Sequence, residues 1–249
     1  MLVNKFTKGR NGMYIVTLED NTKLTIHEDL ILKYNILITK NITDSQKDNI
    51  LAENKKYEIY EVALSYISKK IRSSKELRKY LLKKEYQVDL IDDAIELLYT
   101  QGYLNDKIYA KSLVHDRILL SMDGPNKIKK ELSDNNIDNA IIEEAIAEYS
   151  HEIELERIEK IVNKQIKLNT NKGSNLLKKK INMYLINLGY NLDLINNVLN
   201  SINISDNNLY KKEYDKLYKT LSQKYSGKEL EYRLKQKLYQ KGFKINDYE

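Results

Sequence analysis

A repeated spacing of apolar residues is the feature that most constrains the fold of this chain. The repeat is counted from a central position that recurs at intervals of 51, 53 and 53 residues: Tyr86, Ile137, Tyr190 and Phe243. Position −9 holds Leu77, Ile128, Ile181 and Leu234. Position −5 holds Leu81, Leu132, Leu185 and Leu238, and position +5 holds Ile91, Ile142, Ile195 and Tyr248. Positions −9 and −5 share one face of a helix, so the spacing predicts four copies of a helix, a turn and a second helix.

A further helical segment precedes each of these pairs. Ahead of the third copy, Leu155, Ile158, Val162 and Ile166 follow a helical period. The unit is therefore a three-helix module of about 50 residues, which makes the protein mainly α. Only 8 glycines and 1 proline interrupt the 249 residues, in keeping with a helix-rich chain. We expect repeats at 51–105, 106–150 and 151–204, and a partial fourth repeat at 205–249.

The first 50 residues follow a different pattern. Residues 13–18 and 22–26 are rich in β-branched and aromatic side chains, and Glu19-Asp20-Asn21 lies between them. This arrangement predicts a β-hairpin. Residues 30–34 predict a short helix, and Thr43 is a capping residue for another helix. The segment 1–50 is therefore expected to be a small hairpin unit with short helices.

Capping residues mark where several helices begin and end. Ser73 and Glu76 have the spacing of a capping box, and Ser226 and Glu229 repeat it. The only proline, Pro125, suits a first helical turn, where its missing N–H does no harm. Glycine stands at position −1 in the last two copies, as Gly189 and Gly242, where a tight turn is expected.

Bulk properties narrow the cellular setting. The formal charge of +6 is modest for this length, so a nucleic-acid role has to rest on local clusters of charge. No cysteine is present, which excludes disulfides and thiolate metal sites. The chain has neither an 18-residue apolar run nor the apolar core of a secretion signal at its start. We expect a cytoplasmic protein with no membrane partner.

Three motifs follow one another between residues 63 and 132. The first is Ala63-Leu64-x-Tyr66-Ile67-x-x-Lys70-x-Arg72-Ser73-x-x-Glu76-Leu77. The second is Leu98-x-x-x-Gly102-Tyr103-Leu104-Asn105-Asp106-x-x-Tyr109-Ala110. The third is Asp116-Arg117 followed by Gly124-Pro125-x-x-Ile128-x-x-Glu131-Leu132. In order and spacing these motifs resemble those of the RecX family, regulators of the recombinase RecA. The resemblance is dense from about residue 60 to 147, and the last hundred residues share only the repeat.

The sequence departs from the family pattern at two places. Asn105 stands where the family usually has a first Asp, and Asn135-Asn136-Ile137 replaces the usual Lys-Gly-Ile. The second change removes one basic residue and the turn glycine. It weakens the expectation that the second module is as basic as the first.

The resemblance implies both a shape and a task. It implies tandem three-helix repeats in an elongated, curved array, preceded by the N-terminal hairpin. It further implies a non-enzymatic protein that lies along the groove of the RecA–DNA filament and restrains its growth, ATP turnover and strand exchange. Expected partners are the RecA filament and single- and double-stranded DNA of any sequence. We expect a monomer that needs no cofactor.

Basic side chains on the predicted middle helices are the candidate contacts to DNA or to the filament. The candidates are Lys70, Arg72, Lys75, Arg78, Lys79, Lys83, Lys84, Lys127, Lys129, Lys130, Lys178, Lys179, Lys180, Arg233, Lys235 and Lys237. Such residues fit backbone phosphates without reading bases, or acidic patches on a protein filament. For each lysine the alternative is a solvated helix face. Arg72 is the best single candidate because its fork binds phosphate in two places, and its alternative is an ion pair with a helix carboxylate. Arg117 interrupts an apolar stripe and is expected to form a structural ion pair.

Catalytic interpretations find little support. His27, His115 and His151 are isolated from one another and are expected on the surface. Lys172-Gly173-Ser174 lacks the glycine-rich loop of a phosphate-binding P-loop. We predict no active site and no metal site, and an enzyme is the weakest of the hypotheses. The main alternative is a helical-repeat scaffold that binds a protein partner and ignores DNA.

Overall fold

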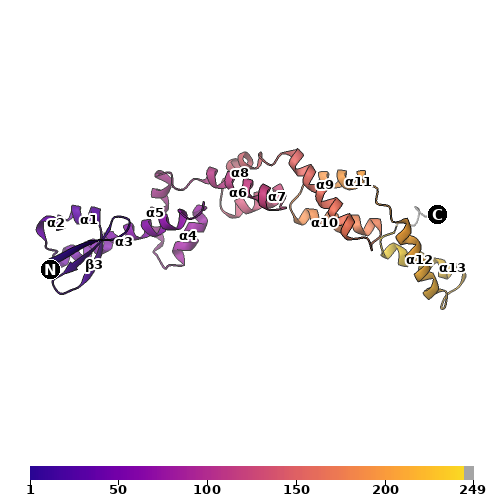
Figure 1. The fold of residues 1–249 in the computed structure, drawn as a ribbon, viewed down its shortest axis with the longest axis horizontal. Coiled ribbons are helices and arrows are strands. Elements are labelled where there is room, and N and C mark those ends of the chain that lie inside the picture. Colours follow the sequence, from indigo (N-terminus) through magenta and orange to yellow (C-terminus); the bar gives the residue numbers. More distant parts are fainter. Residues whose placement is uncertain (244–249) are drawn as a thin grey trace. The chain divides into compact units, whose positions relative to one another are not determined.

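The computed structural model describes residues 1–243, so Tyr248, the fourth copy's residue at position +5, lies outside the described range. Figure 1 shows the ribbon with its elements labelled. The chain divides into two compact units, Met1–Tyr109 and Ala110–Glu249. The protein is mainly α with a small N-terminal sheet, as the sequence predicts.

The first unit opens with a three-stranded antiparallel sheet in the order β1-β2-β3. Strands β2 (Met13–Leu18) and β3 (Lys23–His27) form the predicted hairpin, with Tyr14 opposite Ile26. Strand β1 (Val3–Lys8) was not predicted. Only Val3 of this edge strand is buried, so its sequence lacks the apolar alternation that marks β2 and β3.

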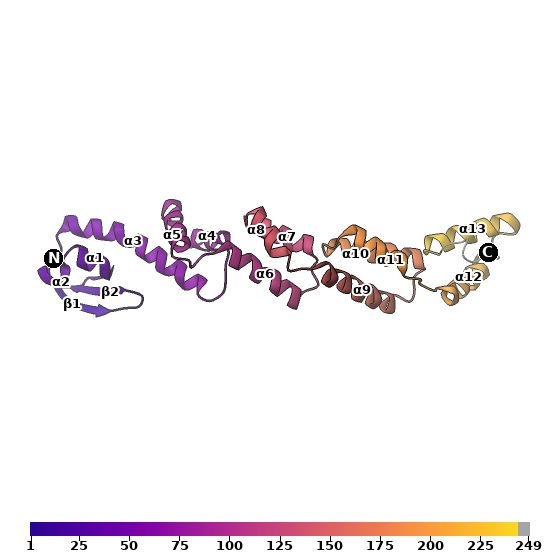
Figure 2. The same cartoon turned by 90° about the horizontal axis from the view of Figure 1, so that it is seen from above.

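Two short helices and one long helix cover this sheet. They are α1 (Glu28–Lys33), α2 (Ile36–Thr39) and α3 (Asp44–Ile67). In Figure 2, α3 runs from the sheet to the helices that follow it in the same unit. The buried side chain of Asn54 joins α3 to strand β3. Its Oδ1 accepts from the His27 N–H at 2.9 Å, and its Nδ2 donates to the Thr25 carbonyl at 2.8 Å. The His27 side chain is mostly buried and stacks on the Tyr57 ring. The sequence-based expectation that His27 lies on the surface is therefore wrong.

The first module consists of α3, α4 (Ser74–Leu82) and α5 (Val88–Thr100). Its core contains Ile59, Leu77, Leu81, Ile91 and Leu98, each completely buried. The capping box of Ser73 and Glu76 is present: the Glu76 N–H donates to Ser73 Oγ, and Glu76 Oε2 accepts from the Ser73 N–H. The sequence pattern thus places both helix starts and core residues of this module correctly.

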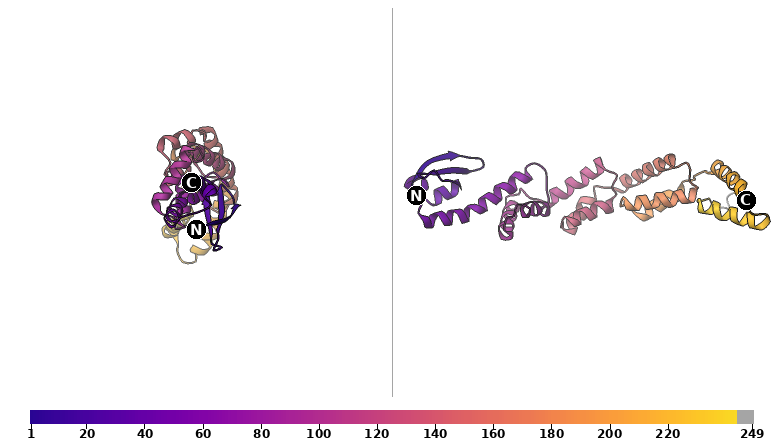
Figure 3. Two further views of the ribbon diagram at one scale, coloured as in Figure 1. Left: turned by 90° about the vertical axis from the view of Figure 1, so that its left-hand side faces the viewer. Right: turned by 90° about the horizontal axis from the view of Figure 1, so that it is seen from below.

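The remaining helices follow the same order. They are α6 (Asp106–Leu120), α7 (Pro125–Asp134), α8 (Asn139–Ile146), α9 (His151–Leu168), α10 (Ser174–Asn187), α11 (Leu192–Ser201), α12 (Asn207–Leu221) and α13 (Gly227–Gln240). We call α6–α8 the second module, α9–α11 the third and α12–α13 the fourth. Figure 3 shows α9 and α10 of the third module side by side.

Three positions of the repeat are buried in every described copy. Every residue at −9, −5 and, in the first three copies, +5 is buried. Position −1 has a positive φ in all four copies, at Glu85 (62°), Asn136 (60°), Gly189 (87°) and Gly242 (90°). The turn is therefore shared even where glycine is absent. The second predicted capping box is wrong: Ser226 stands at the N-cap of α13, but its side chain accepts no capping hydrogen bond.

Backbone contacts join neighbouring modules within the second unit. At the start of α7, the Gly124 N–H donates to the Leu188 carbonyl at 2.6 Å and the Asn126 N–H to the Gly189 carbonyl at 3.0 Å. The start of α10 makes the same pair of bonds to the carbonyls of Lys241 (3.1 Å) and Gly242 (3.0 Å). A Cβ atom on Gly189 would lie 2.4 Å from the Lys127 nitrogen, so this approach requires glycine.

Candidate nucleic-acid interface

Two of the predicted contact residues form ion pairs inside their own module. In both cases a basic residue at position −8 of the repeat pairs with a carboxylate at position +6. In the first module Arg78 of α4 pairs with Asp92 of α5. In the second module Lys129 Nζ lies 2.7 Å from Glu143 Oε1. Arg78 and Lys129 therefore hold two helices of their own module together. The 14-residue spacing is present in the sequence, but the apolar positions that predict the repeat do not include it.

Arg72 forms the ion pair that was the alternative to phosphate binding. Its NH1 lies 3.2 Å from Glu76 Oε1, one turn along α4, and its guanidinium carbon lies 4.9 Å from the centre of the Tyr66 ring. Tyr66 in turn stacks on Tyr80 with 3.9 Å between ring centres. The two rings thus face each other, which leaves less of their surface for a nucleobase.

Other basic residues of the first module are more available. Lys70, Lys75, Lys79 and Lys83 are exposed. Of these, the side-chain ammonium groups of Lys70, Lys79 and Lys83 have no hydrogen-bond or ion-pair partner within residues 1–243. Lys84 lies 5.5 Å from the centre of the Tyr80 ring. The accessible positive charge of this module therefore sits on one side and at the end of α4.

Most basic side chains of the second module form ion pairs with carboxylates of the same module. Besides Lys129, Lys127 pairs with Asp123 at 2.6 Å, and Lys130 is exposed. Arg117 donates from Nε to Glu131 Oε2 at 2.9 Å and from NH2 to Oε1 at 2.6 Å, which confirms the structural ion pair predicted for it. Residues 106–150 contain six Lys and Arg against nine carboxylates. This module is the least suited to phosphate.

The three consecutive lysines of the third module have three different environments. Lys178 Nζ donates to the carbonyls of Leu199 (2.6 Å) and Ile202 (2.8 Å), so it closes the end of α11. Lys179 is exposed. Lys180 Nζ lies 3.2 Å from Asn169 Oδ1, an oxygen that Lys172 Nζ also approaches to 3.1 Å. Of the three, Lys178 has a structural role that the sequence cluster does not reveal.

The fourth module combines cations with tyrosines. Arg233 lies 3.7 Å from Glu229 and 5.4 Å from the centre of the Tyr225 ring, while Lys235 and Lys237 are exposed. On α12, Tyr210, Tyr214 and Tyr218 form a row with 6.0 and 6.1 Å between successive ring centres. Exposed rings among cations are the residue types that hold single-stranded nucleic acid.

Formal charge is distributed unevenly along the chain. Residues 1–150 carry 23 Lys and Arg against 24 carboxylates, whereas residues 151–249 carry 19 against 12. The positive excess therefore belongs to the third and fourth modules. The basic residues of the first module are almost balanced by the carboxylates of the same module, so a cluster of lysines and arginines on its middle helix does not give it the largest positive excess.

Other kinds of site have no support in the described part of the chain. Within residues 1–243, no three His, Asp or Glu side chains gather closely enough to hold a metal ion. The same range contains no helix both long and apolar enough to cross a bilayer.

Comparison with known proteins points to one family. Residues 60–98 match the model described as RecX, first three-helix domain, and residues 105–146 match RecX, second three-helix domain. Regulatory protein RecX of Lactococcus lactis subsp. cremoris strain SK11 is 31% identical over 248 residues, covering 94% of this chain and 91% of that protein. Regulatory protein RecX of Streptococcus sanguinis strain SK36 is 29% identical over 257 residues, covering 99% of this chain and 96% of that protein.

Solved structures share the fold. A crystal structure of regulatory protein RecX matches 80% of this chain and 99% of its own with a TM-score of 0.69, at 19% identity. The crystal structure of RecX from Lactobacillus salivarius matches 59% of this chain and 96% of its own with a TM-score of 0.55, at 28% identity.

Proposed function

This chain belongs to the RecX family, and we propose that it regulates the recombinase RecA by binding the RecA–DNA filament. In this proposal it restrains filament growth, ATP turnover and strand exchange, and it contacts the DNA through positive charge. It acts by binding alone, as a cytoplasmic monomer without a cofactor.

The observation that carries the proposal is a repeated module whose exposed cations recur from copy to copy. Lys79 in the first module and Lys130 in the second stand at position −7, and Lys179 in the third stands about one turn earlier, at position −11; all three are exposed. A filament offers the same phosphates and protein surfaces at regular intervals, so a repeated surface matches a repeated target. The net positive charge of the third and fourth modules supports contact with phosphate.

The chemistry of these residues limits what the contact can do. Exposed lysines act as point charges and neutralise phosphates without distinguishing bases. Binding should therefore be independent of sequence and should weaken steeply as salt rises. We therefore propose no sequence preference.

A binding experiment separates this proposal from a scaffold that binds only protein. Labelled single-stranded DNA is titrated with the protein at low and at moderate salt, and sedimentation with preformed RecA–DNA filaments follows. The proposal expects DNA binding that falls with salt, and cosedimentation with filaments. Cosedimentation without any DNA binding at low salt would favour the scaffold, and loss of both would reject the proposal.

A further inference from the structure

Two lysine side chains in the third module converge on one neutral oxygen. Asn169 ends α9, and its Oδ1 lies 3.1 Å from Lys172 Nζ and 3.2 Å from Lys180 Nζ. The Asn169 Nδ2 is held by the carbonyl and the side-chain oxygen of Gln165, at 2.9 and 3.1 Å. The amide is therefore fixed so that its oxygen faces both ammonium groups.

This arrangement leaves positive charge uncompensated. Neither lysine forms an ion pair with a carboxylate within residues 1–243. The pKa of Lys172 lies below its ordinary value, mainly because its ammonium group lies close to that of Lys180 and to a lesser degree because it is partly buried. Two like charges that share a neutral acceptor repel each other, and an anion between them would remove that repulsion.

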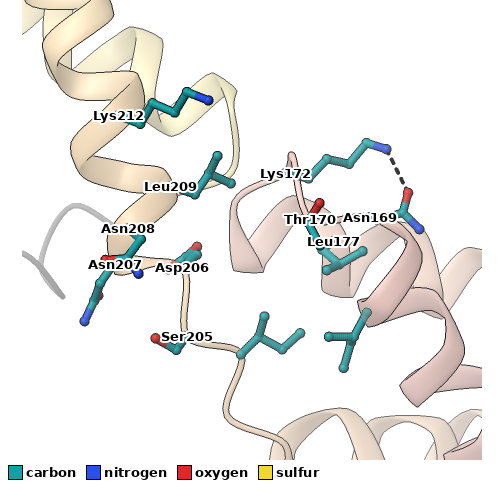
Figure 4. A pocket seen from close by; sticks show the side chains of 12 residues that line it. Asn169, Thr170, Lys172, Leu177, Ser205, Asp206, Asn207, Asn208, Leu209 and Lys212 are labelled. Atoms are coloured by element: carbon teal, nitrogen blue, oxygen red, sulfur yellow. Dashed lines mark hydrogen bonds between the residues drawn. The ribbon is translucent and has the colours of Figure 1, made fainter.

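A cavity of about 580 Å³ opens beside Lys172, between the third module and α12 of the fourth (Figure 4). Lys212 of α12 also lines it, with Thr170, Ser205, Asn207 and Asn208. These side chains add one cation and several hydrogen-bond donors. The cavity is open to solvent and large enough for a phosphate group with the sugar attached to it.

Among the described residues that line the cavity, the one carboxylate already has a hydrogen-bond partner. Asp206 Oδ2 accepts from the Ser174 N–H at 2.5 Å, so it satisfies the start of α10. Isoleucine and leucine side chains make up the apolar part of the described lining, which contains no aromatic ring. A nucleobase would lack a ring to stack on, so the lining favours the phosphate and sugar of a ligand over its base.

We propose that Lys172, Lys180 and Asn169 form a site for a phosphate group, with Lys212 facing it across the cavity. The natural ligand that we propose for this site is a backbone phosphate of DNA, and this identification rests on the proposed function. A free phosphate compound offers the same chemistry. The site also assigns a contact role to Lys172, which the sequence pattern does not predict because Lys172-Gly173-Ser174 lacks the glycine-rich loop of a P-loop.

The test compares two double variants that remove equal charge. Lys172→Ala with Lys180→Ala removes the site, and Lys160→Ala with Lys164→Ala removes two exposed lysines of α9 in the same module. Binding of a labelled single-stranded oligonucleotide is measured by fluorescence anisotropy across a salt series. Thermal melts check that both variants fold.

The site variant should bind roughly tenfold more weakly than wild type, because charged hydrogen bonds are lost. Its salt slope should fall by about 1, the loss of one phosphate contact. The control should lose about twofold or less. Asn169→Asp keeps both lysines but sets a carboxylate between them, and it should weaken binding as the site variant does. Equal losses in the two double variants, or full binding by Asn169→Asp, would overturn the site.

A second arm identifies the source of the phosphate and separates failure of the site from failure of the proposed function. Pyrophosphate is titrated while the Asn169 side-chain amide is followed by NMR. A shift in wild type that the site variant abolishes supports the site even if the oligonucleotide does not bind. In that case DNA binding is rejected and a free phosphate compound is the ligand. An unmoved Asn169 amide, together with equal oligonucleotide binding by both variants, rejects the site alone.

Discussion

The first and third modules share one backbone plan but use their charged side chains differently. In the first, Arg72 and Arg78 each lie against a carboxylate, Glu76 and Asp92. In the third, position −8 holds Asn182, which donates to Asn196 at 3.1 Å, and the lysine pair meets only the oxygen of Asn169. A cluster of basic residues in a sequence therefore does not measure the charge that is available to a ligand.

This difference has a physical origin in the packing of helices. A middle helix has to be fixed to the helix that follows it, and an ion pair or an amide pair at the same position both serve that purpose. In the third module the amide pair of Asn182 and Asn196 joins the two helices, so no basic residue is needed for that contact. The middle helices α4 and α10 carry three basic residues each, yet the third module has the larger positive excess.

The same comparison applies at position −1, where the largest effect is expected. Gly189→Ala should destabilise the protein by about 2–4 kcal/mol, because alanine disfavours the positive φ and its Cβ would meet the backbone of Lys127. Asn136→Ala at the equivalent turn meets only the conformational penalty and should cost about 1 kcal/mol. Urea unfolding measures both. Equal losses of unfolding free energy would show that the contact between the Gly189 turn and Lys127 does not require glycine.

The central position of the repeat gives the next largest effect. Tyr190 is buried and its hydroxyl donates to the Met122 carbonyl at 3.0 Å, whereas Tyr86 is only partly buried. Tyr190→Phe should therefore cost about 1 kcal/mol, and Tyr86→Phe much less. Denaturant unfolding of the two variants decides this, and a larger loss for Tyr86→Phe would contradict the assignment.

The pH dependence follows from the same side chain. Burial raises the pKa of the Tyr190 hydroxyl well above its ordinary value of 10.0. The folded state thus favours the neutral phenol, so its stabilisation is complete below pH 10 and is lost as the pH rises further. Wild type should lose more stability than Tyr190→Phe between neutral pH and pH 10.5. Parallel losses would mean that Tyr190 does not titrate with unfolding.

Charge reversal tests whether the first module also contributes to binding. Lys79→Glu with Lys83→Glu changes two exposed residues and leaves the ion pairs of Arg72 and Arg78 intact. We expect DNA affinity to fall several-fold and the salt slope to become shallower. Thermal stability should stay within about 0.5 kcal/mol of wild type. An unchanged salt slope would remove α4 from the interface.

The smallest effect is expected from releasing a paired cation. Asp92→Asn removes the partner of Arg78, so the guanidinium becomes available to phosphate. DNA binding should tighten by about twofold, while stability falls by at most about 1 kcal/mol because the pair is exposed. Asn196→Ala in the third module is the matched control and should leave DNA binding unchanged. Weaker binding by Asp92→Asn would mean that the ion pair itself positions the interface.

Periodic features of the fold were predictable from sequence, and features that depend on three-dimensional contacts were not. Leu77 and Leu81 take their predicted buried places because helical spacing alone determines their face. Strand β1 was missed because an exposed edge strand carries little apolar pattern. The convergence of Lys172 and Lys180 on Asn169 depends on the course of the α9–α10 loop, which no spacing rule supplies.

The most direct test of the proposed function measures the DNA-dependent ATPase of the cognate RecA. The recombinase is assembled on single-stranded DNA, and the protein is added from far below equimolar amounts up to equal concentration. The proposal predicts that ATP hydrolysis falls at amounts well below that of the recombinase, since one regulator bound to a filament restrains many subunits. Hydrolysis that stays unchanged at equal concentration would contradict it.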